Sequence, residues 1–303
     1  MAALLGAPTV LAARAAGTLY AGPATDTAFT VITPRLLNAL YPDQRLNAEG
    51  VADDAAALDR VAADPTSGAV ADLASMVQFA ASKKLPPDRL EFHGPLEQHC
   101  LLAFAQRDGW VHAFSDIITA EGSPRPVVGL AGSAAVSLFA IMRKQEPGLA
   151  AVTTQSGDPD ALAQQVKRGA LDLLLIVAYR DLDHDLVVRL ADDDRLTPLP
   201  VVTRLLSHAA LDRNSGFSME TVRTDSGLTP WGRPKPITFC TPTGVVLRGD
   251  APAALRDAVN RAVPKVADSL RQSLTDRVST ATTNTLHDAL DTVQGLITRL
   301  RSN

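Results

Sequence analysis

The chain has 303 residues, 46% of them hydrophobic, which is enough apolar material for two cores of ordinary domain size. Its formal net charge is −4, and no run of Lys or Arg is long enough to follow a phosphate backbone. The composition therefore predicts two lobes and excludes a nucleic-acid partner.

Residues 1–17 begin with an apolar, alanine-rich run and contain a small-residue site at Ala13 to Ala15. This pattern resembles the end of an export signal without its basic start, so we expect a signal-peptide remnant here. A plain buried first helix is the alternative. No other segment reaches about 18 consecutive apolar residues, and we therefore expect a chain that does not itself span a membrane.

Strand and helix patterns alternate from residue 18 onward. The predicted order is strand 18–22, helix 23–42, strand 45–51, helix 53–65, and a strand that runs into a helix over 67–82. Apolar residues recur at helical spacing in the first helix, for which Asp26 or Thr25 is the expected cap, and Asp53 opens the second helix. This β-α-β-α-β order predicts a largely parallel sheet with helices on both faces.

The same alternation restarts after a polar connector at 112–126. Before the connector, strand material surrounds residues 100–105. After it the predicted order is strand 127–132, helix 133–148, strand 149–155, helix 158–169, strand 170–179, helix 180–194 and strand 196–202. The repetition predicts a second lobe of the same α/β type.

Residues 203–236 mix Gly, Ser, Thr and Pro and are expected to loop before the chain re-enters the first lobe as strand 237–250 and a helix over 251–263. Two crossings between lobes predict a cleft between them. We accordingly assign 18–118 and 236–262 to lobe I and 119–235 to lobe II.

The remaining segment, 263–303, is an expected C-terminal helical extension with a break at 279–285. Its apolar face either packs on its own lobe or forms a dimer or partner contact.

The chain has two cysteines, Cys100 and Cys240, which lie in no CxxC or Cys/His spacing and so do not predict zinc. They are either two buried thiols or one long-range disulfide. None of the six histidines belongs to an HExxH motif, and no GxSxG or phosphate-binding loop is present. The acidic stretch "RDLDHD" from Arg180 lacks the glycine of a calcium loop and fits a helix start. We expect no enzyme, no metal and no cofactor.

Several segments, in their order, resemble a known family. They are "GLAGSAA" from residue 129, "GDPDALAQQVKRGALDLLLIVAY" from 157, "LVVRLADDDRLTPLPV" from 186, and the return segment "ITFCTPTGVVLRGDAPAALRDAVNRAV" from 237. Together they resemble type II periplasmic solute-binding proteins, and they are most similar to the TAXI family, whose members deliver solutes to TRAP transporters. The resemblance covers residues 18–265 and implies a two-lobed periplasmic-binding-protein fold, each lobe a mainly parallel sheet flanked by helices. The chain departs from the family at Ala134 and Ala135, where a hydroxyl usually follows the glycine-serine pair.

Ligands of such lobes lie beyond the carboxyl ends of the strands, where loops lead into helices. The candidates at these points are Thr25, Asp26, Thr27, Asp72, Ser75, Gly132, Ser133, Ala134, Tyr179 and Arg180. Backbone N–H groups at Gly132 and Ser133 suit a carboxylate, which Arg180 would pair with. Asp26 and Asp72 instead favour a hydroxyl, an amine or a bound cation, unless they only cap helices.

We therefore expect a periplasmic solute-binding protein that captures a small solute, a carboxylate among the options, and delivers it to a TRAP/TAXI or ABC transporter. A ligand-sensing receptor with a separate signalling partner is one alternative, and an enzyme on the same fold is another.

Overall fold

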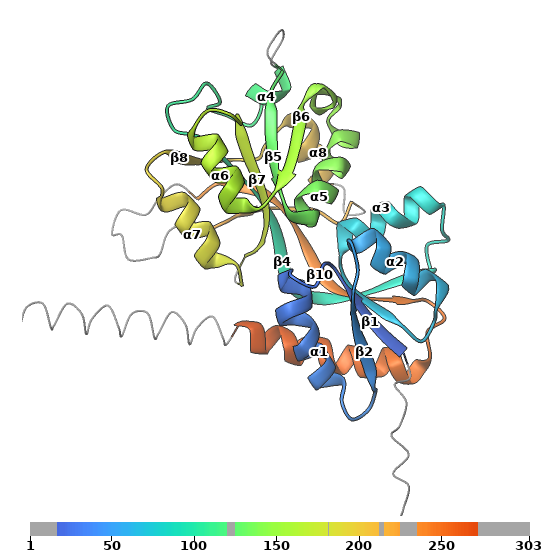
Figure 1. The fold of residues 1–303 in the computed structure, drawn as a ribbon. Coiled ribbons are helices and arrows are strands. Elements are labelled where there is room, and N and C mark those ends of the chain that lie inside the picture. Colours follow the sequence, from blue (N-terminus) through green and yellow to red (C-terminus); the bar gives the residue numbers. More distant parts are fainter. Residues whose placement is uncertain (1–16, 120–124, 181, 212–214, 225–234, 272–303) are drawn as a thin grey trace, which may run out of the picture.

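The computed structural model describes residues 17–119, 125–180, 182–211, 215–224 and 235–271, and within them the chain forms two α/β lobes (Figure 1). Lobe I contains β1 (Gly17–Ala21), β2 (Leu46–Gly50) and β3 (Gly68–Asp72), the π-helix η1 (Ala28–Ile32), and helices α1 (Thr33–Leu40), α2 (Asp54–Ala63) and α3 (Leu73–Lys83). Strand β1 pairs in parallel with both β2 and β3. The parallel β-α-β-α-β unit predicted from the sequence is confirmed.

Lobe II repeats this arrangement. It contains strands β5 (Val127–Ala131), β6 (Thr153–Gly157), β7 (Leu173–Tyr179), β8 (Leu196–Leu199) and β9 (Ser218–Thr221), helices α4 (Asp116–Thr119), α5 (Gly132–Gln145), α6 (Pro159–Lys167), α7 (His184–Asp192) and α8 (Arg204–Leu211), and the 3-10 helix η2 (Pro147–Ala151). Strand β5 pairs in parallel with β6 and β7. The prediction that 203–236 only loops was wrong, because α8 and β9 lie within it.

Two long strands connect the lobes: β4 (Leu90–Gln106) and β10 (Ile237–Arg248). They pair antiparallel with each other, and β10 also lies beside β3 while β4 lies beside β7. The strand order is therefore β2-β1-β3-β10-β4 on the side of lobe I and β4-β7-β5-β6 on the side of lobe II. Figure 1 shows both strands running from one lobe to the other. Residues Leu90 to Cys100 of β4 pair with β10, and residues His99 to Ala105 pair with β7, so the two pairings overlap at His99 and Cys100.

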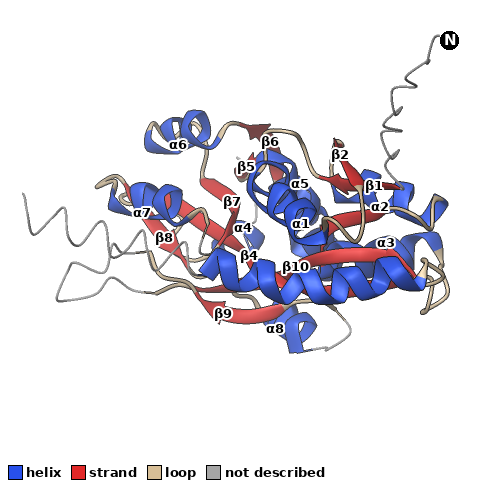
Figure 2. Ribbon diagram, turned by 90° about the horizontal axis from the view of Figure 1, so that it is seen from below, coloured by secondary structure: helices blue, strands red, loops and turns tan. Residues whose placement is uncertain are grey.

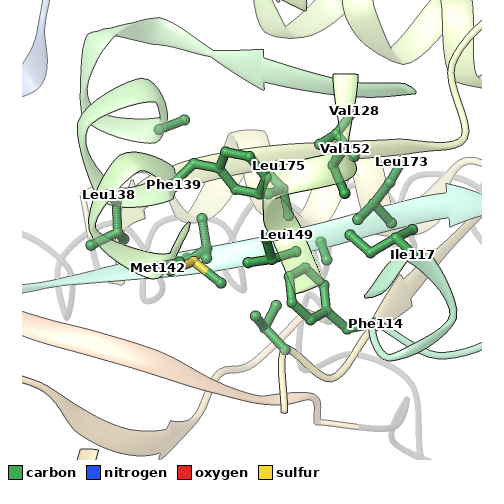
Figure 3. Close-up of a cluster of buried hydrophobic side chains, with 14 of the residues drawn as sticks. Phe114, Ile117, Val128, Leu138, Phe139, Met142, Leu149, Val152, Leu173 and Leu175 are labelled. Atoms are coloured by element: carbon green, nitrogen blue, oxygen red, sulfur yellow. The ribbon is translucent and has the colours of Figure 1, made fainter. Parts of the chain in front are cut away.

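Alternate side chains of the central strands supply two cores in lobe II. Leu173 and Leu175 of β7 lie in one cluster with Phe139 and Met142 of α5 (Figure 3). Leu174 and Ile176 face the opposite layer, which contains residues of α6 and α7. Because helices cover both faces of the sheet, the sequence of β7 is a continuous apolar run rather than an alternation of apolar and polar residues. Leu173, Leu174 and Leu175 are 0% exposed.

The last described segment belongs to lobe I. Residues 253–271 are helical, and in Figure 2 this long helix runs beneath the sheet. Val263, Val266 and Leu270 are buried in the same cluster as Leu36 of α1 and Leu247 of β10. The part of the expected extension that is described thus packs on its own lobe. The predicted break at 279–285, the remainder of the extension and the predicted signal remnant at 1–16 lie outside the described residues.

Cys100 and Cys240 form a disulfide between β4 and β10, which decides between the two readings of these cysteines. The two residues are direct partners in the antiparallel register, and both are 0% exposed. Their sequence separation is 140 residues. The cross-link therefore joins the two crossing strands at the place where the chain passes between lobes.

Replacing both cysteines with alanine should lower the free energy of unfolding by about 2 to 4 kcal/mol, because the unfolded chain regains the freedom that a long cross-linked loop removes. Urea denaturation monitored by circular dichroism measures this loss. Wild-type protein in reductant should unfold at the same urea concentration as the variant. Equal stability of the oxidised wild type and the variant would contradict the prediction.

Candidate functional site

A cavity of about 440 Å³ lies between the lobes, and residues of both lobes line it. Its walls come from the segments that follow the parallel strands: the turn after β1, the starts of α2 and α3, the starts of α5 and α6, and the turn after β7. In parallel α/β sheets these carboxyl ends are the usual position of ligands. The cavity is therefore the candidate site.

The structure brings nine of the ten predicted residues together around this cavity. They are Thr25, Asp26, Thr27, Asp72, Ser75, Gly132, Ser133, Ala134 and Tyr179. Arg180 is not among the lining residues, and its guanidinium pairs with Glu220 of β9 at 3.1 Å.

Six further polar residues line the cavity that the sequence reasoning did not select. They are Asp53, Asp54, His99, Ser137, Asp158 and Asp183. Asp53 and Asp158 cap the helices α2 and α6, accepting hydrogen bonds from the backbone N–H groups of Ala56 and of Asp160 and Ala161. The signal that could have found the acidic residues is their position at the end of a strand or a few residues after it, which Asp26 and Asp72 share.

A buried network forms the floor of the cavity. Nδ1 of His99 lies 2.8 Å from a carboxylate oxygen of Asp72, whose other oxygen accepts a hydrogen bond from the Thr243 hydroxyl. The His99 ring stacks on the ring of Tyr179, with centroids 4.1 Å apart. Burial works against a charged His99, but the carboxylates of Asp72, Asp54 and Asp183 together outweigh it and raise the pKa of the imidazole. The network thus fixes one histidine and one carboxylate side by side.

Asp54 lies next to this network without a cationic partner. One of its oxygens accepts a hydrogen bond from the backbone N–H of Asp72 at 3.2 Å, and Ser75 contributes a second. Burial, and then the neighbouring Asp72 carboxylate, raise the pKa of Asp54 to about 7. At neutral pH this carboxyl therefore exchanges its proton readily.

Two hydrogen bonds cross the cleft between the lobes. The Ser133 hydroxyl, at the start of α5, donates to Asp26 at 3.3 Å, and the Thr27 hydroxyl donates to Asp183 at 2.9 Å. Each lobe thus supplies one hydroxyl and one carboxylate. Burial raises the pKa of Asp26 despite the hydrogen bond from Ser133. We call these two contacts the interlobe pairs.

The start of α5 also meets the cavity with its backbone. Gly132 has a φ of +77°, and a Cβ at this position would meet no atom within 4 Å. No side chain caps the first N–H groups of this helix. These groups offer a partial positive charge of roughly half a unit. Together with His99 and the other helix starts at the cavity, it gives positive character to a lining in which the described residues include six aspartates and neither Lys nor Arg.

Within the described residues, no group of three or more His, Cys, Asp or Glu side chains has the arrangement of a metal site. In the same part of the chain, no helix has both the length and the apolar character needed to cross a membrane.

No protein-family model and no curated protein matches the sequence. Solved structures resemble the chain in fold. The structure described with glutathione import through GshT and the cystine importer TcyBC of Streptococcus mutans has a TM-score of 0.49 at 10% identity, covering 87% of this chain and 95% of that one. The arginine-, lysine-, histidine-binding protein ArtJ of Geobacillus stearothermophilus has a TM-score of 0.49 at 9% identity, covering 86% and 94%.

A substrate-binding protein of an amino acid ABC transporter has a TM-score of 0.48 at 11% identity, covering 86% of this chain and 98% of that one. Similarity at this level leaves the function to be argued from the site.

Asp54→Asn should stabilise the ligand-free protein at pH 8 by about 1 to 3 kcal/mol. The folded-state pKa of this carboxyl, about 7, lies above its ordinary value of 3.8, so its ionisation opposes folding increasingly as the pH rises from 4 to 7. The gain should be smaller at pH 5. Urea denaturation at both pH values measures it, and Asp59→Asn, on the exposed face of the same helix, is the control. A loss of stability at pH 8 would contradict the assignment.

Removing both interlobe pairs with Thr27→Val and Ser133→Ala should shift the ligand-free protein toward a wider separation of the lobes. Each neutral hydroxyl bond contributes about 0.5 to 1.5 kcal/mol, so the equilibrium should shift about tenfold. Spin labels at exposed positions 59 of α2 and 164 of α6 report the separation by pulsed electron resonance. An unchanged distance distribution would count against a role of these pairs in holding the lobes together.

Proposed function

We propose that this chain is an extracytoplasmic solute-binding protein, which captures a small molecule in the interlobe cavity and delivers it to a membrane transporter. The observation that carries the proposal is the cavity lined by strand ends of both lobes, at the junction spanned by β4 and β10. A ligand there touches both lobes at once. Its binding energy can therefore favour one relative position of the lobes over another.

The interlobe pairs support this mechanism. Asp26 and Asp183 accept hydroxyl hydrogen bonds from the opposite lobe, and both residues line the cavity. A ligand with donors exchanges these contacts for its own, so that closure and ligand binding depend on the same side chains.

The disulfide supports a location outside the cytoplasm, since such bonds persist in oxidising compartments. We place the protein in the periplasm, with a TRAP/TAXI or an ABC transporter as its partner. A signalling protein in place of a transporter is the alternative partner for the same cavity.

The pair of Asp72 and His99 favours a second candidate, an enzyme that uses the imidazole as a base. The two functions are separated by the fate of the bound molecule. We expect a thermal-shift screen of small solutes to give a stabilising compound that mass spectrometry recovers unchanged. Recovery of a product in its place would establish the enzyme.

Gly132→Ala should reduce the affinity for that solute at least tenfold, because the new methyl group enters the cavity. The positive φ alone costs about 1 to 2 kcal/mol of stability. Gly169→Ala is the matched control: Gly169 has a φ of +71° but does not line the cavity. It should lose similar stability and keep its affinity. Equal affinities of the two variants for the solute would contradict the proposal that the solute binds in this cavity.

A further inference from the structure

Our further inference concerns the ligand and rests on the proposed function. Among the residues that the structure describes, six aspartates line the cavity, four from lobe I and two from lobe II, and no Lys or Arg does. Asp53 and Asp158 are committed to helix N–H groups. The remaining four carboxylates are Asp26, Asp54, Asp72 and Asp183. They are the groups available to a ligand.

The protein itself balances only part of this negative charge. Asp72 has His99 as a neighbour of opposite charge once the ring is protonated. Asp26 and Asp183 have the neutral hydroxyls of the interlobe pairs, and Asp183 also accepts a hydrogen bond from the backbone N–H of Tyr179. Asp54 has a backbone N–H and a hydroxyl. The start of α5 adds about half a positive unit. The carboxylates therefore outnumber the positive charges that the protein places around the cavity. Because buried carboxylates without counter-charges are costly, a positively charged ligand would stabilise them.

We propose that the cavity binds a small organic cation whose ammonium or guanidinium N–H groups are held by Asp26, Asp54 and Asp72 of lobe I and by Asp183 of lobe II. Carboxylates accept only, and charge-assisted hydrogen bonds from such N–H groups are among the strongest in proteins. An anionic solute would meet four carboxylates in this cavity. The predicted carboxylate ligand therefore finds no support in the lining.

The alternatives to an N–H cation fit the cavity less well. A bare metal ion needs a close set of ligands, and the described residues contain no such group of three. A quaternary ammonium is held by an aromatic cage. The aromatic rings of this lining are His99 and Tyr179, and they stack on one another at 4.1 Å.

Binding of the cation should release a proton. The pKa of Asp54 is about 7, so this carboxyl is partly protonated at neutral pH, and a nearby positive charge favours its ionised form. The same charge lowers the pKa of His99, and the effect on binding has the same sign. The groups that face Asp54 and the cation across the cavity are Asp26, Asp53, Asp72, His99, Asp158, Tyr179 and Asp183. Affinity should therefore rise with pH.

The test compares four solutes of similar length that differ in charge: 1,4-diaminobutane, agmatine, 1,4-butanediol and succinate. Isothermal titration calorimetry at pH 8 and low salt should detect binding of the two cations and none of the diol or the dianion. Between pH 8 and pH 6 the affinity for the cation should fall about tenfold, as the ionised fraction of Asp54 falls. Titration in two buffers of different ionisation enthalpy should reveal the released proton.

Asp54→Asn should weaken the binding of the cation at least tenfold and abolish most of its pH dependence, whereas Asp59→Asn should leave both unchanged. Asp54→Asn is expected to fold well, so a loss of binding is not a loss of structure. Binding of succinate or the diol without the cations would overturn this inference and leave the solute-binding function standing. Failure of every solute in this panel and in the broader screen would contradict the proposed function and the inference together.

Discussion

The antiparallel pairing of β4 with β10 holds the molecule together as two lobes with one cleft. Both strands belong to the sheets of both lobes, and the register places Cys100 opposite Cys240 where they cross. The parallel strands are ordered outward from this pair, and their carboxyl ends face the junction. A cavity whose walls come from so many separate segments exists only because this pairing brings them to one place.

The acidic residues of the cavity lower the stability of the folded protein. Asp54 and Asp72 lie close enough that one raises the pKa of the other, and both are held on elements that the core fixes in position. A protein selected for stability alone would place an amide or an apolar side chain there. Destabilising groups that converge on a cavity are typical of binding sites, in which a ligand supplies the missing contacts.

Much of the fold follows from the sequence. The continuous apolar run of β7 predicts a buried strand, and Asp53 and Asp158 are capping residues that mark the starts of α2 and α6. The turns after β1, β3 and β5 were also predictable, since a small or polar residue follows each strand. The role of His99 was not predictable. It lies in "EFHGPLEQHC", where Gly and Pro obscure the strand period, so only the three-dimensional register with Tyr179 reveals it. Likewise, the partner of Arg180 is Glu220, in a strand within a segment that reads as a loop.

The uneven distribution of the carboxylates has a kinetic consequence. Three of the four aspartates proposed to bind the cation, and His99 beside them, lie on lobe I or at the crossing, whereas lobe II contributes Asp183 and the start of α5. An incoming cation therefore finds most of its partners already assembled before the lobes meet. Lobe I then governs the rate of capture, which long-range attraction accelerates, and lobe II governs how long the captured molecule stays.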